Sequence, residues 1–429
     1  MSLKKIKSNY SFWEVMNLKR TIKKSLYVPF LLTVVLALFV AGCSSQSSTK
    51  KDDVITLNLV DYYAGWQADL LTTSINQFME SHPNIKIIQK SVPYSSFMPK
   101  LEQQIATKSL PDILLMDNTD VPKLAATGAL EPLSNLGDVP KNDYMEAALS
   151  TGMYKDKIYA LPSGINTLSL IYNKKIFQEA GMEPPATWDD VIAAAKKLNS
   201  DKMHGIIFSA INNEEGSWQF LPILWSNGGD FSSIDSPQSV EALEFWVSLV
   251  KEGVAPKQVL NWSQDDTVQQ FIDGKAAMMI GGSWETPALN QAEGLEYGQV
   301  PMPTKEPGIK VIGPLGGEAW AIPSSSDEKM KAAWTFVNWI QGKDQQIKLN
   351  VDMGQLSGLT SATEQIVQEV SYLQIYSDLV KNGRARSSYG PNYPQLSKAL
   401  WTAIQSAMTG MQTPQQALQE AKKSIDQIK

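Results

Sequence analysis

The chain of 429 residues has few of the residues that build disulfides and metal sites, with one cysteine and two histidines. A single cysteine excludes an internal disulfide framework, and the histidines are too few for a Cys/His metal site. His82 lies beside a predicted turn and His204 at a predicted strand start, where we interpret both as structural rather than catalytic. We therefore expect no metal and no cofactor.

Charged residues are also few, at 19%, and they are unevenly distributed. The first 42 residues contain seven Lys/Arg and one Glu, which leaves 31 basic and 43 acidic residues and a formal net charge of −12. No basic cluster or RNA-binding motif is present, so this surface is unsuited to nucleic acid. The GxSxG, HExxH and P-loop motifs are absent too. Carboxylates remain plentiful enough to build a glycoside-acting site.

The long apolar run of the chain lies near its N-terminus. Leu26–Val40 follows a basic stretch, and the next residues, Val-Ala-Gly-Cys43, match the lipobox of bacterial lipoproteins. The run is too short and wrongly flanked for a membrane span. We expect residues 1–42 to be a lipoprotein signal peptide, with the hypothesis that translation starts at Met16. Cys43 would be lipidated, with 43–52 as a polar tether. A plain signal peptide or an uncleaved anchor is the alternative.

Beyond the tether, strand and helix patterns alternate, which predicts an α/β protein. Strong β formers at 54–60 precede a helical pattern at 66–80 and a second strand at 85–90, a βαβ opening. A further buried strand, 111–117, ends on Asp117. This order places loops at the carboxyl ends of the strands, where open α/β sheets bind ligands.

Later segments have equally clear signals. Residues 154–162 alternate apolar and polar and predict a strand, and Thr187 is placed to cap a helix through Leu198. Trp218 precedes an expected helix at 220–225.

Three longer motifs resemble a known family. They are YKDKIYALPSGINTLSLIYNKKIFQEAGMEPPATWDD from Tyr154, QQFIDGKAAMMIGGSW at 269–284 and GPLGGEAWAIP at 313–323. They are similar to segments of the carbohydrate-type bacterial extracellular solute-binding proteins of ABC importers, the family of maltose-binding protein, and the resemblance extends over nearly the whole mature chain. It implies an α/β, two-lobed periplasmic-binding-protein fold of type II, with the ligand cleft between the lobes.

The resemblance also implies a domain division and a function. Lobe 1 would comprise 53–162 and 313–360, and lobe 2 would comprise 163–312 and 361–429. The protein would be a monomeric receptor, not an enzyme, held by its lipid on the extracellular face of the cell membrane. It would capture a sugar or oligosaccharide and deliver it to permease subunits and, through them, a cytoplasmic ATPase.

Aromatic residues are abundant, with 12 Trp and 14 Tyr. Flat aromatic faces cover the C–H side of a sugar ring, and polar groups bind its hydroxyls. Several aromatic residues fall in predicted loops or at strand ends: Tyr62, Tyr63, Trp66, Trp218, Trp262, Trp284, Trp320, Tyr389 and Tyr393. The residues expected to bind the substrate are Tyr62, Tyr63, Asp117, Asn166, Trp218, Trp284, Glu318, Trp320, Arg386 and Tyr393. Trp284 and Trp320 stand out because family members carry stacking aromatics in matching segments.

Each candidate has a structural alternative. The aromatic side chains could pack in the core, Asp117 could cap a helix, Asn166 could serve a turn, and Arg386 could form an ion pair. The function has alternatives as well. One is a receptor of the same fold for a charged solute such as a polyamine or an iron chelate. Others are a secreted glycoside-acting enzyme and an adhesion protein with no ligand in a cleft.

Overall fold

The computed structural model of the protein describes residues 54–428. The predicted signal peptide, Cys43 and the polar tether lie outside the described residues. Within the described range, no helix is both long and apolar enough to cross a membrane.

The first sheet has five strands, and its parallel part confirms the predicted βαβ opening. In spatial order they are β2 (Ile85–Ser91), β1 (Ile55–Asp61), β3 (Ile113–Asp117), β12 (Glu318–Ala321) and β6 (Ala160–Pro162). Strand β1 is parallel to β2 and β3, while β12 is antiparallel to β3 and β6. The carboxyl ends of β1 and β3 therefore share one edge, which places the segments after both strands near each other.

The second sheet has four strands, and the buried strand predicted before Trp284 is one of its central members. The spatial order is β10 (Tyr297–Val300), β7 (Leu168–Asn173), β9 (Ala276–Gly282) and β8 (His204–Ile207). Every residue of β9 is buried. Two small pairs complete the strands: β4 (Met153–Tyr154) with β5 (Lys157–Ile158), and β11 (Pro314–Leu315) with β13 (Arg384–Ala385).

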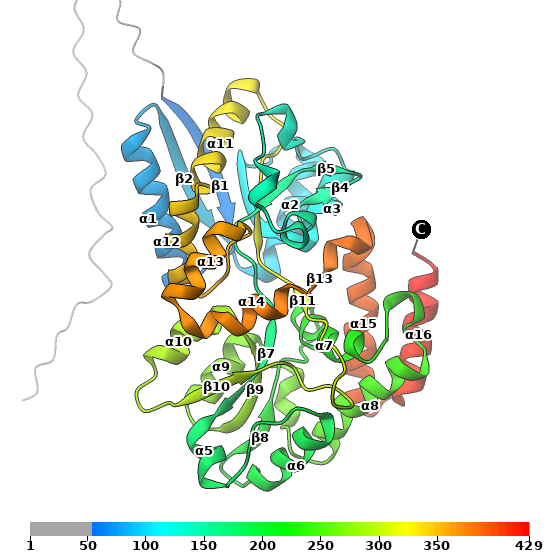
Figure 1. Cartoon of the computed structure of the whole chain (residues 1–429). Helices are drawn as coiled ribbons and strands as arrows, with labels where there is room; N and C mark the ends of the chain where they lie inside the picture. Colours follow the sequence, from blue (N-terminus) through cyan, green and yellow to red (C-terminus); the bar gives the residue numbers. More distant parts are fainter. Residues whose placement is uncertain (1–53, 429) are drawn as a thin grey trace, which may run out of the picture. The chain divides into compact units, whose positions relative to one another are not determined.

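The helices divide into two groups, one around each sheet (Figure 1). Around the first sheet are α1 (Trp66–Ser81), α2 (Tyr94–Thr107), α3 (Val121–Ala126), α4 (Glu146–Ser150), α11 (Asp327–Ile340), α12 (Lys343–Met353), α13 (Thr360–Glu369) and α14 (Gln374–Val380). Around the second are α5 (Lys174–Glu179), α6 (Trp188–Leu198), α7 (Glu214–Ser226), α8 (Pro237–Lys251), α9 (Gln264–Ile272), α10 (Thr286–Gln291), α15 (Tyr393–Met408) and α16 (Pro414–Asp426).

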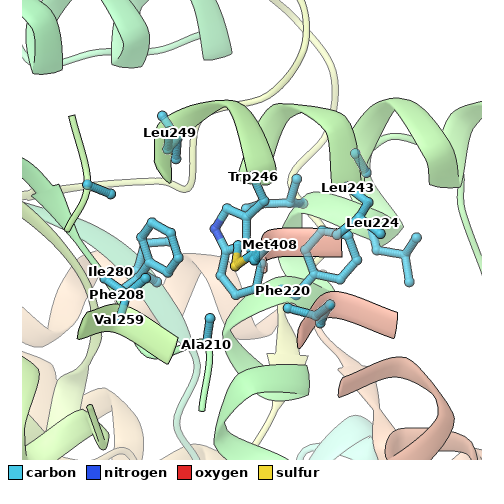
Figure 2. Packing of buried hydrophobic residues seen from close by; sticks show 14 of the residues in the cluster. Phe208, Ala210, Phe220, Leu224, Leu243, Trp246, Leu249, Val259, Ile280 and Met408 are labelled. Atoms are coloured by element: carbon cyan, nitrogen blue, oxygen red, sulfur yellow. The ribbon is translucent and has the colours of Figure 1, made fainter. Parts of the chain in front are cut away.

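Alternation along the strands separates the cores on the two faces of each sheet. In β12, Trp320 belongs to one core of the first sheet, whereas Ala319 and Ala321 belong to the other. The largest core of the second sheet contains a group of packed aromatic rings. Figure 2 shows Trp246 of α8 with Phe208 and Phe220, whose ring centroids lie 4.7 and 5.0 Å from that of Trp246.

The chain passes between the two cores three times, and the third passage lies later than expected. Ile366, Tyr376 and Ala385 pack in a core of the first sheet, whereas Leu400 and Ile404 pack in a core of the second. Residues 361–385, expected in lobe 2, therefore pack with lobe 1. Helical periodicity gives a helix a buried face but does not say which core that face meets. The other boundaries stay predictions.

Local details confirm the predicted helix cap at Thr187 and correct two other predictions, one about a strand and one about the start of a helix. The Thr187 side chain accepts the amide of Asp190, and Asp190 accepts that of Thr187, a reciprocal capping box. The expected strand at 154–162 is instead a tight β4–β5 hairpin followed by β6. Helix α7 begins at Glu214, so Trp218 lies inside it and not in a preceding loop.

Candidate functional site

A pocket of about 240 Å³ lies where the two sheets and their connecting segments meet. From the first lobe, the lining includes the segment that follows β1 and the end of β3, and from the second it includes the first turns of α7 and α9. The three crossing segments, on which the chain passes between the cores of the two sheets, contribute Asn166, Gly316 with Gly317, and Arg386. The lining residues are Tyr62, Tyr63, Ala64, Gln67, Tyr94, Asp117, Asn166, Glu214, Glu215, Trp218, Ser263, Gln264, Asp265, Trp284, Gly316, Gly317, Glu318, Gln355 and Arg386.

The wall from the first lobe is built around Glu318. Asp117 and Glu318 face each other across the β3–β12 pair. The hydroxyls of Tyr62 and Tyr63 donate to the two oxygens of Glu318, at 3.1 and 2.9 Å. Burial raises the pKa of Glu318, and the hydrogen bond from Tyr63 opposes this effect. The position of Glu318 is therefore held by both tyrosines.

The wall from the second lobe combines two indole rings with two helix N-termini. Trp218 of α7 and Trp284, which follows β9, lie with ring centroids 6.2 Å apart and planes at 47°. The carboxylate of Glu215 accepts the amide of Gln264 at 2.7 Å, which joins the first turn of α7 to that of α9. The two rings and the linked helix starts give this wall apolar faces beside polar groups.

Arg386 connects groups from the two lobes. It is 3% exposed, and its guanidinium donates to Asp117 at 3.0 Å and to Glu214 at 2.6 Å. It also lies over the Trp218 ring, 4.2 Å from the centroid. Burial alone would lower the pKa of Arg386, but the two carboxylates raise it above the ordinary value, so the guanidinium stays charged.

Two glycines allow the indole rings to lie close to the backbone. A Cβ at Gly316 would lie 2.5 Å from the Trp218 ring and 2.3 Å from the Oδ1 of Asn166. A Cβ at Gly282 would lie 1.9 Å from the Trp284 ring. Such distances are well below van der Waals contact, so larger residues at these positions would displace the two rings.

The structure brings eight of the ten sequence-predicted residues to the pocket. They are Tyr62, Tyr63, Asp117, Asn166, Trp218, Trp284, Glu318 and Arg386. Asp117 and Arg386 line the pocket and also have the structural roles named above as their alternatives. Asp117 caps the turn at Thr119, and Arg386 is paired with carboxylates.

Trp320 and Tyr393 do not line the pocket. Trp320 is fully buried and packs edge-to-face on Phe336, with ring centroids 5.4 Å apart. It lies on the same face of β12 as Glu318 but two residues further along the strand, so it reaches the core and not the pocket. Tyr393 lies behind the pocket and donates to Glu214 at 2.7 Å.

Three other aromatic residues that were predicted in loops or at strand ends also lie outside the pocket. Trp66 is exposed at the start of α1, Trp262 packs against two cores of the second lobe, and Tyr389 donates to Asp230 at 2.7 Å. None of the three lines the pocket.

Sequence reasoning missed the acidic helix starts. Asn213-Glu-Glu before an apolar run is a helix N-terminal signal, and the Asn213 side chain accepts the amide of Glu215 at 2.8 Å. Ser263-Gln-Asp-Asp is a second signal of the same kind, with a capping box between Ser263 and Asp266. These signals locate helix starts, but they do not show that both starts face one pocket. The other lining residues that were not predicted are Ala64, Gln67, Tyr94, Gly316, Gly317 and Gln355.

Comparisons with known proteins agree with this architecture. A galactooligosaccharide-binding protein of Bacillus subtilis is 23% identical over 91% of this chain and 94% of its own length. A maltotriose-binding protein of Pyrococcus abyssi is 26% identical over 66% of this chain and 62% of its own. Both relatives are binding proteins by name, not enzymes.

Solved structures have the same fold. A solute-binding protein of an ABC transporter from Thermotoga lettingae, bound with α-D-tagatose, superposes with a TM-score of 0.80. It is 26% identical, and the match covers 87% of this chain and 99% of that one. Maltose-bound MalE3 of T. maritima superposes with a TM-score of 0.79 at 23% identity, over the same shares.

A family model completes the comparison. The model of the bacterial extracellular solute-binding protein family matches residues 73–373, which is most of the described chain and includes every strand of the two larger sheets except β1. The chain belongs to the bacterial extracellular solute-binding proteins.

Proposed function

We propose that this protein is the substrate-binding lipoprotein of an ABC importer and that it captures a sugar or oligosaccharide in the described pocket. The observation that carries the proposal is the combination of the Trp218 and Trp284 faces with polar side chains in one pocket that both lobes line. The rings would cover the C–H faces of a sugar, and the polar groups would bind its hydroxyls.

Delivery follows from closure of the lobes. Asp117 comes from the first lobe and Glu214 from the second, and both contact Arg386, so the described arrangement brings the lobes together. A sugar bound between the lobes would favour a closed form only through its better contacts with that form. Membrane permease subunits, with their cytoplasmic ATPase, would recognise the loaded closed form of a monomeric receptor.

Attachment to the membrane rests on the sequence. The Val-Ala-Gly-Cys43 motif supports cleavage before Cys43 and addition of a diacylglycerol there. We expect Cys43→Ser to release the protein from the cell surface into the medium. Cell fractionation would measure this, and retention of the variant on the membrane would contradict the anchor.

Catalysis is the main competing function. Carboxylates line the pocket, and paired carboxylates are what glycoside hydrolysis needs. The proposal is a binding protein, because the relatives named above are binding proteins. Chromatography of the sugar before and after incubation separates the two functions, since consumption of the sugar would support the enzyme.

A thermal-shift screen of the mature protein tests the proposal directly. The ligands are mono- and oligosaccharides, polyamines and ferric chelates. A sugar at 100 times its dissociation constant adds about 2.7 kcal/mol to the free energy of unfolding. We expect a selective rise with one sugar series. A response only to a non-sugar cation or a ferric chelate would contradict the sugar receptor.

A further inference from the structure

We infer that the natural ligand carries positive charge as well as hydroxyls, which identifies it as an amino sugar or an oligosaccharide of amino sugars. This inference rests on the proposed function and narrows its substrate class. It follows from the charge balance of the pocket and from the indole rings and amide side chains that line it beside the carboxylates.

The charges that line the pocket are strongly unbalanced. One guanidinium and no lysine accompany five carboxylates, which are Asp117, Glu214, Glu215, Asp265 and Glu318. The guanidinium of Arg386 already forms ion pairs with Asp117 and Glu214, at 3.0 and 2.6 Å. Pairing within the pocket thus leaves the other three carboxylates without a positive partner.

These three carboxylates belong to both lobes. In the part of the chain that the structure describes, no ion pair includes Glu215, Asp265 or Glu318. Glu318 receives the two tyrosine hydroxyls, and Glu215 receives the Gln264 amide and a longer bond from Asn213. Each oxygen can accept more than one hydrogen bond, so both carboxylates can still bind an ammonium group.

The other groups around the pocket indicate whether the positively charged partner is a metal ion or an organic cation. Among residues 54–428, no three Asp, Glu, His or Cys side chains lie close enough to hold a metal ion. Independently of the carboxylates, the Trp218 and Trp284 rings, 6.2 Å apart, provide faces for an organic ring. The acidic side chains therefore fit an organic ammonium ion better than a metal.

Ring faces and neutral polar groups separate an amino sugar from a polyamine. The two indole rings line the pocket beside the amide side chains of Gln67, Asn166 and Gln355. A sugar ring covers an indole face with its C–H side, and its hydroxyls form hydrogen bonds with amide groups. A polyamine has neither a ring nor hydroxyls, whereas an amino sugar has both, together with an ammonium group for Glu318 or Glu215.

The test is isothermal titration of the mature protein with sugars that differ at one substituent. Cellobiose, N,N′-diacetylchitobiose and the β-1,4-linked glucosamine dimer share a skeleton and carry hydroxyl, acetamido and ammonium groups at C2. Glucose, N-acetylglucosamine, glucosamine, galactose and galactosamine cover the monosaccharides. We expect the ammonium form of at least one set to bind roughly tenfold more tightly than its hydroxyl form. This preference should shrink as salt rises.

Two variants connect the preference to the pocket. Glu318→Gln should reduce the ratio of ammonium-form to neutral-form affinity about tenfold. Glu244→Gln, a change at an exposed carboxylate of α8 outside the pocket, should leave the preference unchanged.

The outcomes distinguish the inference from the proposed function. Equal or tighter binding of the neutral sugars would overturn the amino-sugar inference and leave the sugar receptor intact. Binding of spermidine with no response to any sugar would overturn both. A salt-independent ammonium preference, or one that Glu318→Gln leaves unchanged, would also overturn the charge argument.

Discussion

At the scale of single residues, Trp284 and Trp320 each follow a glycine-containing segment, but their side chains have different surroundings. Trp284 is half-buried beside Trp218 at the pocket, whereas Trp320 is fully buried against Phe336. A ring that keeps one face open can cover a sugar. A ring enclosed on all sides contributes to the stability of the core.

We expect the alanine variants of these two residues to separate binding from stability. Trp284→Ala should weaken sugar binding about tenfold, because a stacking face is lost. Trp320→Ala should lower the free energy of unfolding by roughly 3–5 kcal/mol, because it leaves a cavity in the core. Calorimetric titration and chemical denaturation measure the two effects. Equal losses of stability would show that Trp284 is a core residue too.

A second residue-scale prediction concerns Glu285, which lies next to Trp284 but outside the pocket lining. Burial raises its pKa well above the ordinary value of 4.5, the nearby Asp265 adds to this, and the backbone of Gly282 opposes it. The folded chain therefore holds this proton more tightly than the unfolded chain. The resulting stabilisation is complete below pH 4.5 and is lost as pH rises towards the folded-state pKa.

Glu285→Gln removes this titration. We expect the free energy of unfolding of the variant to fall less between pH 4.5 and neutrality than that of the unchanged protein. Denaturation curves at several pH values measure the slopes. Glu244→Gln is the matched control at an exposed site, and its slope should follow the unchanged protein. Parallel slopes for all three proteins would contradict a raised pKa at Glu285.

At the scale of elements, helix N-termini do two different things. Thr187 caps α6 and Asn213 caps α7, each by accepting a backbone amide with its side chain. The first turn of α7 also carries Glu214 and Glu215 into the pocket, whereas no residue of α6 lines it. Both caps satisfy a backbone amide of their helix, and they differ in what they position.

We expect Thr187→Ala and Asn213→Ala each to lower the free energy of unfolding by about 1 kcal/mol, because each loses a cap. Asn213→Ala should also weaken ligand binding, since the start of α7 is released. Thr187→Ala should leave the dissociation constant unchanged and is the matched control. Thermal denaturation and calorimetric titration measure both quantities. Unchanged binding in Asn213→Ala would show that the cap does not position the acidic pair.

At the scale of the whole molecule, the pocket exists only because distant segments meet. Arg386 lies on the third crossing segment and contacts Asp117 at the end of β3 and Glu214 at the start of α7. Removing one member of a buried ion pair leaves an uncompensated charge, which costs much more than the pair itself contributes. Arg386 therefore joins the pocket to the contact between the lobes.

We expect Arg386→Met to lower the free energy of unfolding by roughly 3–5 kcal/mol and to weaken ligand binding. The triple variant Asp117→Asn, Glu214→Gln, Arg386→Met removes all three charges and should recover part of the lost stability. Chemical denaturation measures the stability, and small-angle scattering with and without ligand measures closure. No recovery in the triple variant would contradict the charge explanation.

Local chemistry in the sequence predicted most elements, and the family resemblance pointed to part of the site. Strand formers gave the order of the βαβ opening, Thr187 marked a helix start, and family motifs placed Trp284 and Glu318 at the pocket. The strand and capping signals depend on near neighbours in the chain, so they can be read without coordinates, whereas the motifs are recognised by their resemblance to a family.

The tertiary structure decided what depends on contacts between distant residues. It placed residues 361–385 with the first core, enclosed Trp320, and turned the starts of α7 and α9 towards one pocket. Periodicity shows that a face is buried, but it does not identify the partner of that face or the depth along a strand. The charge balance of the pocket likewise appeared only when carboxylates from both lobes met around Arg386.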